Sequence, residues 1–203
     1  TVNNPIVLNS SILKELFSQT LFAISTQESR PLLTGLNIRI NGNVMECVTT
    51  DSYRLAKKTI ILDADYGTYD IVVPGKNIQE FDKILTDEEN VKINLFTNKL
   101  LFEYNGYLFQ TSLLSGQYPN TSNLIPTDFE YILTTNLDNF YSAIDRAALL
   151  TQNKDKNLIN MKTAGNELVI TSFASEIGKS EESVAISKNN DKDITISYSA
   201  KYM

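Results

Sequence analysis

Residues 30–35 read Arg30-Pro31-Leu32-Leu33-Thr34-Gly35, and residues 49–56 read Thr49-Thr50-Asp51-Ser52-Tyr53-Arg54-Leu55-Ala56. Proline disfavours helical geometry at the residue before it, so the first stretch predicts a stiff turn with an extended exit into a strand. The second stretch is a polar segment between two apolar runs. Neither stretch carries the residues of a catalytic site, yet both are more specific than packing requires. We expect them to lie side by side and to form a docking surface for other proteins.

The composition excludes several classes of site. The chain has 203 residues, a formal net charge of −6, no histidine and one cysteine, Cys47. Without histidine, the usual general base near neutral pH is missing, and imidazole or thiolate zinc sites are excluded. No glycine-rich phosphate loop or nucleophile elbow is present. The sequence therefore predicts no catalytic residue, no metal and no cofactor, and Cys47 is expected to be a buried, small apolar residue.

Apolar periodicity predicts two helices and a series of strands in the first part of the chain. Asn9–Ser11 can cap a helix from Ile12 to Ile24, and a second helix is expected from Lys76 to Leu85. Turns at Asn41–Asn43 and Asn105-Gly106 indicate hairpins. The expected strands are residues 5–8, 36–40, 44–48, a strand ending at residue 62, and residues 70–73, 91–96, 100–104 and 107–114.

The second part of the chain begins again in the same way. Tyr118 to Thr127 is predicted to be an extended polar linker, followed by a strand from Phe129 to Leu133. Thr134–Asn136 can cap the next helix. The expected apolar side of this helix consists of Leu137, Phe140, Tyr141, Ile144, Ala147 and Ala148. Later strands are expected at residues 158–162, 168–171, 183–187 and 194–198, with a turn at 164–166 between the first two.

This restart indicates an internal repeat of about 124 residues. The first helix matches the later one at an offset of 124, the Gly42-Asn43 turn matches Gly165-Asn166 at 123, and Pro74–Ile78 matches Ser199–Met203 at 125. Three matches in order predict an α+β fold made of repeated units, each with two helices packed on antiparallel sheet. The second unit would stop where its second helix should begin, so we expect the chain to be a piece of a longer protein.

Four motifs, in this order and at these separations, resemble the bacterial sliding clamp family, the β subunit of DNA polymerase III. They are Arg30–Gly35, Thr50–Ala56, Val73–Lys76 and Tyr118–Asn120, and the helix Leu137–Arg146 is similar to the opening helix of the family's third domain. The resemblance covers essentially the whole chain. It implies the DNA-clamp fold, with residues 1–127 as the middle domain and its linker. Residues 128–203 would be a third domain truncated before its second helix.

The resemblance implies a processivity factor of DNA replication that performs no chemistry. Two subunits of three similar domains close into a homodimer ring around duplex DNA and slide without sequence-specific contacts. The implied partners are the DNA polymerase III catalytic subunit, the clamp loader and repair proteins, each through a clamp-binding peptide. The implied location is the bacterial cytoplasm. Two other interpretations stay open, a clamp-like interaction module without ring function and a carboxylate-dependent hydrolase.

The resemblance also implies a pocket for partner peptides. Leucine and proline side chains would supply apolar walls, and the Arg54 guanidinium would offer fixed donors to a peptide carbonyl or carboxylate. In the competing interpretation, Leu33 and Leu55 are core residues and Arg54 pairs with Asp51. The implied pocket residues are Leu33, Thr50, Ser52, Tyr53, Arg54, Leu55, Pro119, Asn123 and Leu124.

The sequence departs from the family pattern at two places in this pocket. Ser52-Tyr53 stands where relatives often have Gly-His, and Asn123 stands where some have a basic residue. Both changes are expected to alter the width and polarity of the pocket. The family's pocket also uses residues near the end of the third domain, which lie beyond Met203, so we expect the pocket formed by this chain alone to be incomplete.

The resemblance finally implies a set of residues that face DNA. Their alternative is simple solvation of a polar helix face, the usual fate of such side chains. Neutralising the cations is expected to weaken DNA retention at low salt if they approach phosphate. The residues are Lys14, Gln27, Arg30, Lys76, Lys83 and Arg146.

Overall fold

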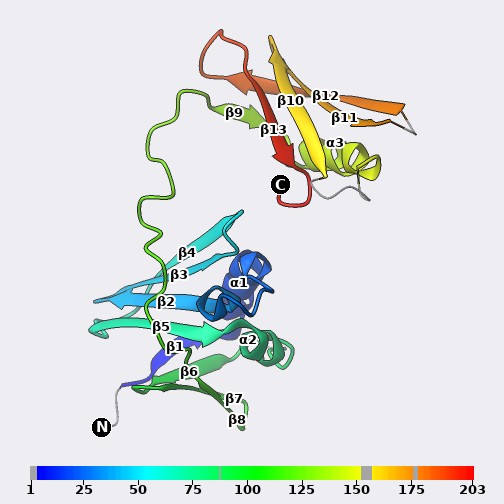
Figure 1. Ribbon diagram of the computed structural model, residues 1–203. Coiled ribbons are helices and arrows are strands. Elements are labelled where there is room, and N and C mark those ends of the chain that lie inside the picture. The colour runs from blue at the N-terminus through cyan, green and yellow to red at the C-terminus, as the bar shows by residue number, and fades with distance from the viewer. Residues whose placement is uncertain (1–3, 87, 152–156, 176–177) are drawn as a thin grey trace. The chain divides into compact units, whose positions relative to one another are not determined.

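The computed structural model describes residues 4–86, 88–151, 157–175 and 178–203. The chain divides into two compact units, unit 1 (Thr1–Asn120) and unit 2 (Thr121–Met203). Each unit is mixed helix and antiparallel sheet (Figure 1). Within the described residues, no helix is long and apolar enough to cross a membrane.

Unit 1 consists of two similar halves, each a strand, a helix and three further strands. The first half is β1 (Ile6–Asn9), α1 (Ser10–Thr20), β2 (Gly35–Asn41), β3 (Val44–Thr50) and β4 (Leu55–Ile61). The second half is β5 (Thr68–Pro74), α2 (Gly75–Asp82), β6 (Asn90–Leu95), β7 (Lys99–Tyr104) and β8 (Tyr107–Ser112). The sheets have the orders β4-β3-β2-β5 and β1-β6-β7-β8, so each half gives its first strand to the sheet of the other. This exchange makes the two halves one folding unit.

The core of unit 1 is formed by both helices and both sheets. Asn9 caps α1, because its side-chain oxygen accepts a hydrogen bond from the Ser11 amide at 2.9 Å. The α1 side chains Leu13, Leu16 and Phe17 are buried. In α2, Phe81 is fully buried and stacks on Phe102 of β7, with ring centroids 4.2 Å apart. One contiguous apolar core therefore ties α1, α2 and the strands together.

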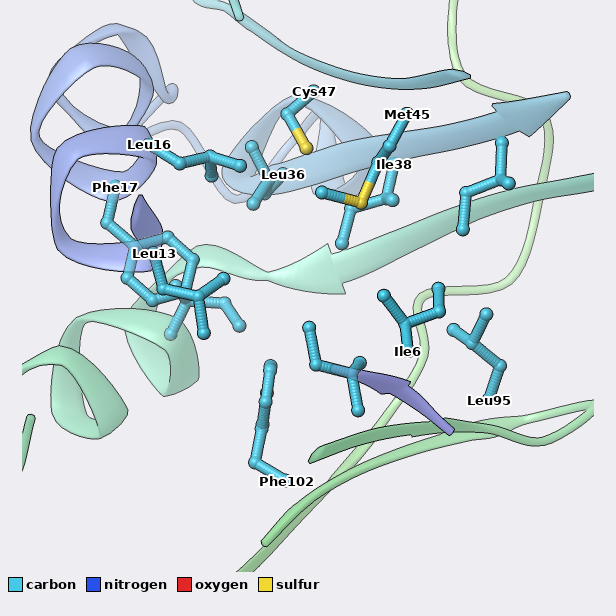
Figure 2. A pocket seen from close by; sticks show the side chains of 13 residues that line it. Ile6, Leu13, Leu16, Phe17, Leu36, Ile38, Met45, Cys47, Leu95 and Phe102 are labelled. Atoms are coloured by element: carbon cyan, nitrogen blue, oxygen red, sulfur yellow. The ribbon is translucent and has the colours of Figure 1, made fainter. Parts of the chain in front are cut away.

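A small cavity lies in this core (Figure 2). It has a volume of about 20 Å³ and is lined by apolar side chains, with the sulfur-bearing Met45 and Cys47 pointing in from β3. A buried water needs two or more polar partners, so an apolar cavity of this size stays dry. The cavity is a packing gap and not a ligand site. Cys47 is buried, as the sequence predicts.

Unit 2 repeats the first helix of unit 1 and the sheet that β5 completes. Its elements are β9 (Leu133–Thr135), α3 (Leu137–Leu149), β10 (Leu158–Ala164), β11 (Glu167–Ala174), β12 (Gly178–Lys188) and β13 (Thr195–Ser199). The sheet order is β13-β10-β11-β12-β9. Four of these strands, β12-β11-β10-β13, have the same order as β4-β3-β2-β5 in unit 1. The predicted duplication of the sheet is confirmed.

Two of the three predicted repeat matches are confirmed by the hairpins and strand register. Gly42 and Gly165 both lie in the left-handed region, with φ of 62° and 59°, and each joins the two central strands of its sheet. Pro74 pairs with Gly35 at the start of β2, and Ser199 pairs with Leu158 at the start of β10.

The helix match at an offset of 124 is wrong. The capping residues of α1 and α3 are Asn9 and Asn136, which lie 127 positions apart. The core-facing residues of α3 are Ala143 and Ala147, with Phe140 and Ile144 packed beside them. Leu137 and Tyr141, which the sequence assigned to the apolar side, are 74% and 68% exposed. The apolar residues of α3 fit more than one helical face, and the structure packs the face of Phe140, Ala143, Ile144 and Ala147, three of which the sequence predicts.

Three predicted boundaries also change. The prediction of a strand at Phe129–Leu133 is wrong, because the strand is β9, which begins only at Leu133, and Phe129 is exposed. The helix expected to reach Ile24 ends at Thr20 and continues as a short 3-10 helix over Leu21–Ala23. The second helix ends at Asp82, three residues before the expected Leu85.

Candidate peptide-binding site

The loop between β3 and β4, residues 51–54, is held by its own polar side chains. The Asp51 carboxylate accepts the backbone N–H groups of Tyr53 and Arg54, both at 3.0 Å. Thr50 Oγ1 accepts the Ser52 N–H at 3.1 Å and donates to the Arg54 carbonyl at 2.7 Å. These bonds replace the strand ladder at the turn and fix the loop. Tyr53 is therefore presented to solvent, 72% exposed, from a well-defined position.

The Arg54 guanidinium is fixed by three contacts. Its Nε forms an ion pair with Asp51 Oδ2 at 3.2 Å, and Nη2 donates to the Phe22 carbonyl at 2.7 Å. The guanidinium carbon also lies 5.4 Å from the centre of the Phe22 ring. The ion pair with Asp51 that the sequence offered as an alternative is present. It orients the guanidinium and leaves the side chain 26% exposed.

A small apolar cluster lies beneath the loop. Leu33, Val48, Val72 and Tyr118 form its buried centre, and Leu55 packs against it from the start of β4. The Tyr118 hydroxyl reaches the loop and accepts the Thr50 backbone N–H at 3.1 Å. Burial raises the pKa of the Tyr118 phenol. Leu33 and Leu55 are thus packing residues as well as pocket candidates.

Tyr118 is the residue that sequence reasoning missed. The sequence predicts an extended polar linker that begins at Tyr118, but the Tyr118 side chain itself is only 2% exposed. The Arg39 Nη2 group donates to the carbonyl of the next residue, Pro119, at 3.3 Å and fastens the segment to β2. The signal available in the sequence was an aromatic residue beside a proline in an otherwise polar stretch.

The turn before β2 also differs from its prediction. Pro31 does not lead into extended backbone; it begins a 3-10 helix, Pro31–Thr34, with Arg30 as its cap. Proline is well suited to the first position of a helix, since its fixed φ matches and its missing N–H would be unpaired there. The short helix turns Leu33 into the apolar cluster. The prediction that Arg30 is not helical is confirmed. The prediction of extended backbone directly after Pro31 is wrong.

Arg30 joins this site from the turn. Its Nη1 donates to the Ser52 hydroxyl at 3.0 Å, so the two stretches that organise the sequence do lie side by side. Ser52 has a φ of 78°, in the left-handed region that glycine adopts more readily. A residue implied to face DNA is therefore bonded directly to a residue implied to line the peptide pocket.

The structure brings together the pocket candidates of unit 1. These are Leu33, Thr50, Ser52, Tyr53, Arg54, Leu55 and Pro119. Asn123 and Leu124 belong to unit 2, where Leu124 donates its N–H to the Thr121 carbonyl in a turn at 3.1 Å. The Leu124 side chain is 62% exposed. The assignment of all nine residues to one pocket stays a prediction.

The cations implied to face DNA are mostly paired. Lys83 lies 2.6 Å from a Glu80 carboxylate oxygen, and Lys76 lies 3.8 Å from that of Glu28. Both pairs are strongly exposed, so solvent screens them and they contribute little to stability. Their charge stays available to a polyanion.

The remaining candidates have different surroundings. Arg146 on α3 forms an ion pair with Glu182 at 2.8 Å, and this bond raises the Arg146 pKa and lowers that of Glu182. Lys14 donates to the Leu85 carbonyl at 2.8 Å. Gln27 has an exposed side chain. These surroundings do not test whether the side chains contact DNA, so the implied DNA-facing set stays a prediction.

The titratable groups of the described residues do not form a chemical centre. No three histidine, cysteine, aspartate or glutamate side chains gather to hold a metal within that part of the chain. Burial raises the pKa of the Cys47 thiol to about 12, so it is not a nucleophile near neutral pH. Both carboxylate oxygens of Asp51, the acid in the candidate site, accept hydrogen bonds from the Arg54 side chain and from backbone N–H groups.

Comparison with known families gives a match along nearly the whole chain. Residues 7–120 match the family described as DNA polymerase III beta subunit, central domain, and residues 122–203 match its C-terminal domain. The beta sliding clamp of Staphylococcus epidermidis is 39% identical over 203 residues, 99% of this chain and 54% of that protein. That of Staphylococcus aureus is 37% identical over 202 residues, again 99% and 54%. The chain thus spans about half the length of these curated relatives.

Solved structures agree with the sequence matches. The sliding clamp of Bacillus subtilis has a TM-score of 0.93 and 36% identity, and the match covers 100% of this chain and 55% of that one. A sliding clamp from Bartonella birtlesii bound to griselimycin has a TM-score of 0.89 and 26% identity, with 100% and 55% coverage. The predicted fold class and family resemblance are confirmed.

Proposed function

The chain belongs to the DNA polymerase III beta subunit family, and on that premise we propose that it is part of a sliding clamp that tethers DNA polymerase III to duplex DNA. Unit 1 corresponds to the central domain and unit 2 to the C-terminal domain, with a linker ending near Thr127. The complete subunit forms a homodimer ring, works in the bacterial cytoplasm and performs no chemistry. Its partners are the polymerase catalytic subunit, the clamp loader and repair proteins.

The observation that carries this proposal is the arrangement around Arg54. A fixed, partly exposed guanidinium lies 5.4 Å from the exposed Phe22 ring, and its neighbours in the chain are the exposed Tyr53 and Leu55, which packs against the apolar cluster. Such a surface suits a short peptide, because apolar anchors bury against the cluster while the guanidinium binds a carbonyl or carboxylate. The pocket residues that the family resemblance implies within unit 1 supply this surface, and Asn123 and Leu124 stay part of the proposed set.

The surroundings of Asp51, the carboxylate of the candidate site, do not favour the hydrolase alternative. A catalytic carboxylate must reach a substrate or a water, whereas Asp51 is engaged with three donors of its own loop. The other alternative, an interaction module without a ring, shares the peptide site with the clamp. Ring formation by the full-length subunit separates the two.

DNA is the second ligand in the proposal. The proposed DNA-facing residues Lys14, Gln27, Arg30, Lys76, Lys83 and Arg146 approach phosphates as sequence-independent contacts, which suit sliding. In the full-length subunit, replacing Lys76, Lys83 and Arg146 by glutamine is expected to shorten retention on circular DNA at low salt. Retention equal to wild type across a salt series contradicts this assignment.

The peptide site is tested directly by binding. We expect the full-length subunit to bind a fluorescent clamp-binding peptide of the DNA polymerase III catalytic subunit, with griselimycin competing for it, and the 203-residue chain to bind the peptide more weakly because its pocket is incomplete. Griselimycin is chosen because a related clamp binds it. Lys83→Gln serves as a matched surface control. No peptide binding by either this chain or the full-length subunit overturns the proposal.

A further inference from the structure

Two Asn-Gly pairs, Asn41-Gly42 and Asn105-Gly106, form hairpin turns that the proposed function does not use. An asparagine before glycine can lose ammonia without an enzyme, because glycine has no Cβ and its backbone nitrogen can approach the asparagine Cγ closely. Solvent takes the proton of that nitrogen, the new N–Cγ bond closes a five-membered succinimide, and Nδ2 leaves as ammonia. Water then opens the ring to aspartate or isoaspartate. Both asparagine side chains are exposed, so the backbone around each glycine decides which pair reacts.

The backbone of Gly42 is held on both sides. Its N–H donates to the Gly67 carbonyl at 2.9 Å, and its own carbonyl accepts the Tyr66 N–H at 3.0 Å. Asn41 ends β2, which is paired with β3 on one side and with β5 on the other. A Cβ on Gly42 would also lie 3.8 Å from a carboxylate oxygen of Asp65, and this negative charge opposes loss of the amide proton. Succinimide formation at Asn41 therefore requires several contacts to break.

The Asn105-Gly106 turn lacks these restraints. It joins β7 to β8, and β8 is the edge of its sheet, with one neighbouring strand. Asn105 and Gly106 have φ of 45° and 78°, and the pair Tyr104–Tyr107 closes the turn. Among the described residues, Gly106 has no acceptor for its N–H and, beyond its chain neighbours, no atom within 4 Å of where a Cβ would lie. The turn must open before nitrogen and Cγ can meet, and an exposed hairpin tip opens at little cost.

We propose that Asn105 is a spontaneous modification site of this protein, and that the fold protects Asn41 from the same reaction. The inference does not depend on the proposed function. Deamidation adds one negative charge to the turn, and the isoaspartate product also adds one methylene group to the backbone. The longer turn no longer fits the Tyr104–Tyr107 register, so the start of β8 loosens.

Mass spectrometry of the ageing protein measures both sites in one sample. The full-length subunit is incubated in mildly alkaline buffer and digested at intervals, and the conversion of amide to carboxylate is followed at each asparagine. We expect Asn105 to be modified at least about tenfold faster than Asn41, because the hydrogen bonds that hold Gly42 make its opening rarer by about that factor.

Unfolding the subunit in urea separates the effect of structure from that of sequence. Both asparagines precede glycine, so in the unfolded chain their rates should differ by less than about twofold. Asn105→Gly suits a turn with positive φ and removes the amide, so most of the isoaspartate of unit 1 should disappear. Asn41→Ser is the matched variant and should leave the isoaspartate yield unchanged. A carboxyl methyltransferase with labelled S-adenosylmethionine measures that yield.

Three outcomes overturn the inference. The first is an equal rate at the two pairs in the folded subunit. The second is an unmodified Asn105 in the folded subunit while the urea-unfolded subunit reacts, because the hairpin tip then stays closed. The third is a preference for Asn105 that persists unchanged in urea, because neighbouring side chains and not the fold then decide the rate. None of these measurements involves DNA or peptide binding, so each leaves the proposed function standing.

Discussion

The sheet β4-β3-β2-β5 of unit 1 and the strands β12-β11-β10-β13 of unit 2 share one order and comparable hairpins, yet they differ at one loop. In unit 1, Thr50 pairs with Leu55 across the loop that carries Asp51 and Arg54. In unit 2, Ala174 pairs with Gly178. The predicted counterpart, around residues 173–177, has no aspartate or arginine, and its residues 176–177 lie outside the described part. The sheet of unit 2 forms without such a polar loop, so packing of the sheet alone does not require it.

The two units also differ in the length of the segment from the helix cap to the next strand of the sheet. In unit 1, β2 begins 26 residues after the cap Asn9, and in unit 2, β10 begins 22 residues after the cap Asn136. The longer connection in unit 1 contains Arg30 and the 3-10 helix Pro31–Thr34, which belong to the candidate site. Both departures from the repeat thus meet at one place, through the Arg30–Ser52 hydrogen bond.

The variant with the largest expected effect tests whether the two units unfold independently. Phe81→Ala removes a fully buried ring that stacks on Phe102, and should cost unit 1 about 3–5 kcal/mol of unfolding free energy. Ile170→Ala, at a fully buried site of unit 2, is the matched variant. Hydrogen exchange in a urea series should show each variant weakening its own unit only. Equal weakening of both units by either variant contradicts the division.

The next effect sharpens the functional difference between the units. Arg54→Ala removes the guanidinium held by Asp51 and Phe22, and should weaken peptide binding about 30-fold, or about 2 kcal/mol. Arg146→Ala, which breaks an exposed ion pair in unit 2, should change binding less than about twofold. Fluorescence polarisation measures both. Similar losses in the two variants argue against a site confined to the Arg54 region.

The single thiol allows a pH test of unit 1 alone. Burial raises the pKa of Cys47 from its ordinary value of about 9 to about 12, so the unfolded chain releases the proton first as pH rises. The thiol's contribution to stability is complete below pH 9 and falls by about 1.4 kcal/mol per pH unit between 9 and 12. Urea unfolding at pH 8 and 10 should show this loss in wild type. A Cys47→Ala control that keeps the same slope contradicts the assignment.

The smallest effect compares ion pairs of the two units. Lys83→Gln breaks an exposed pair in unit 1 and should change stability by less than about 0.5 kcal/mol. Arg146→Gln should have the larger effect, because Glu182 is only 23% exposed and accepts its hydrogen bond directly. Thermal unfolding in low salt and in 1 M NaCl measures both. A larger effect for Lys83→Gln reverses the expected order.

Sequence reasoning succeeded where structure is decided locally. The Gly42 and Gly165 turns and the Asn9 and Asn136 caps depend on residues within one turn, and the structure confirms them. The sequence predicted less well which face of α3 is buried. Successive apolar residues in α3 fit two faces, and only packing against β10, β11 and β12 chose between them.

The sequence by itself determined the antiparallel α+β class, the repeat of the sheet, the family and most of the residues gathered around Arg54, because turn chemistry, strand alternation and motif spacing are local properties. The tertiary structure decided the contacts that make these residues a site. Thr50 meets Tyr118 across 68 positions, Arg54 meets Phe22 across 32, and Arg30 meets Ser52 across 22. Such contacts depend on how separate strands and turns pack, and no local pattern encodes them.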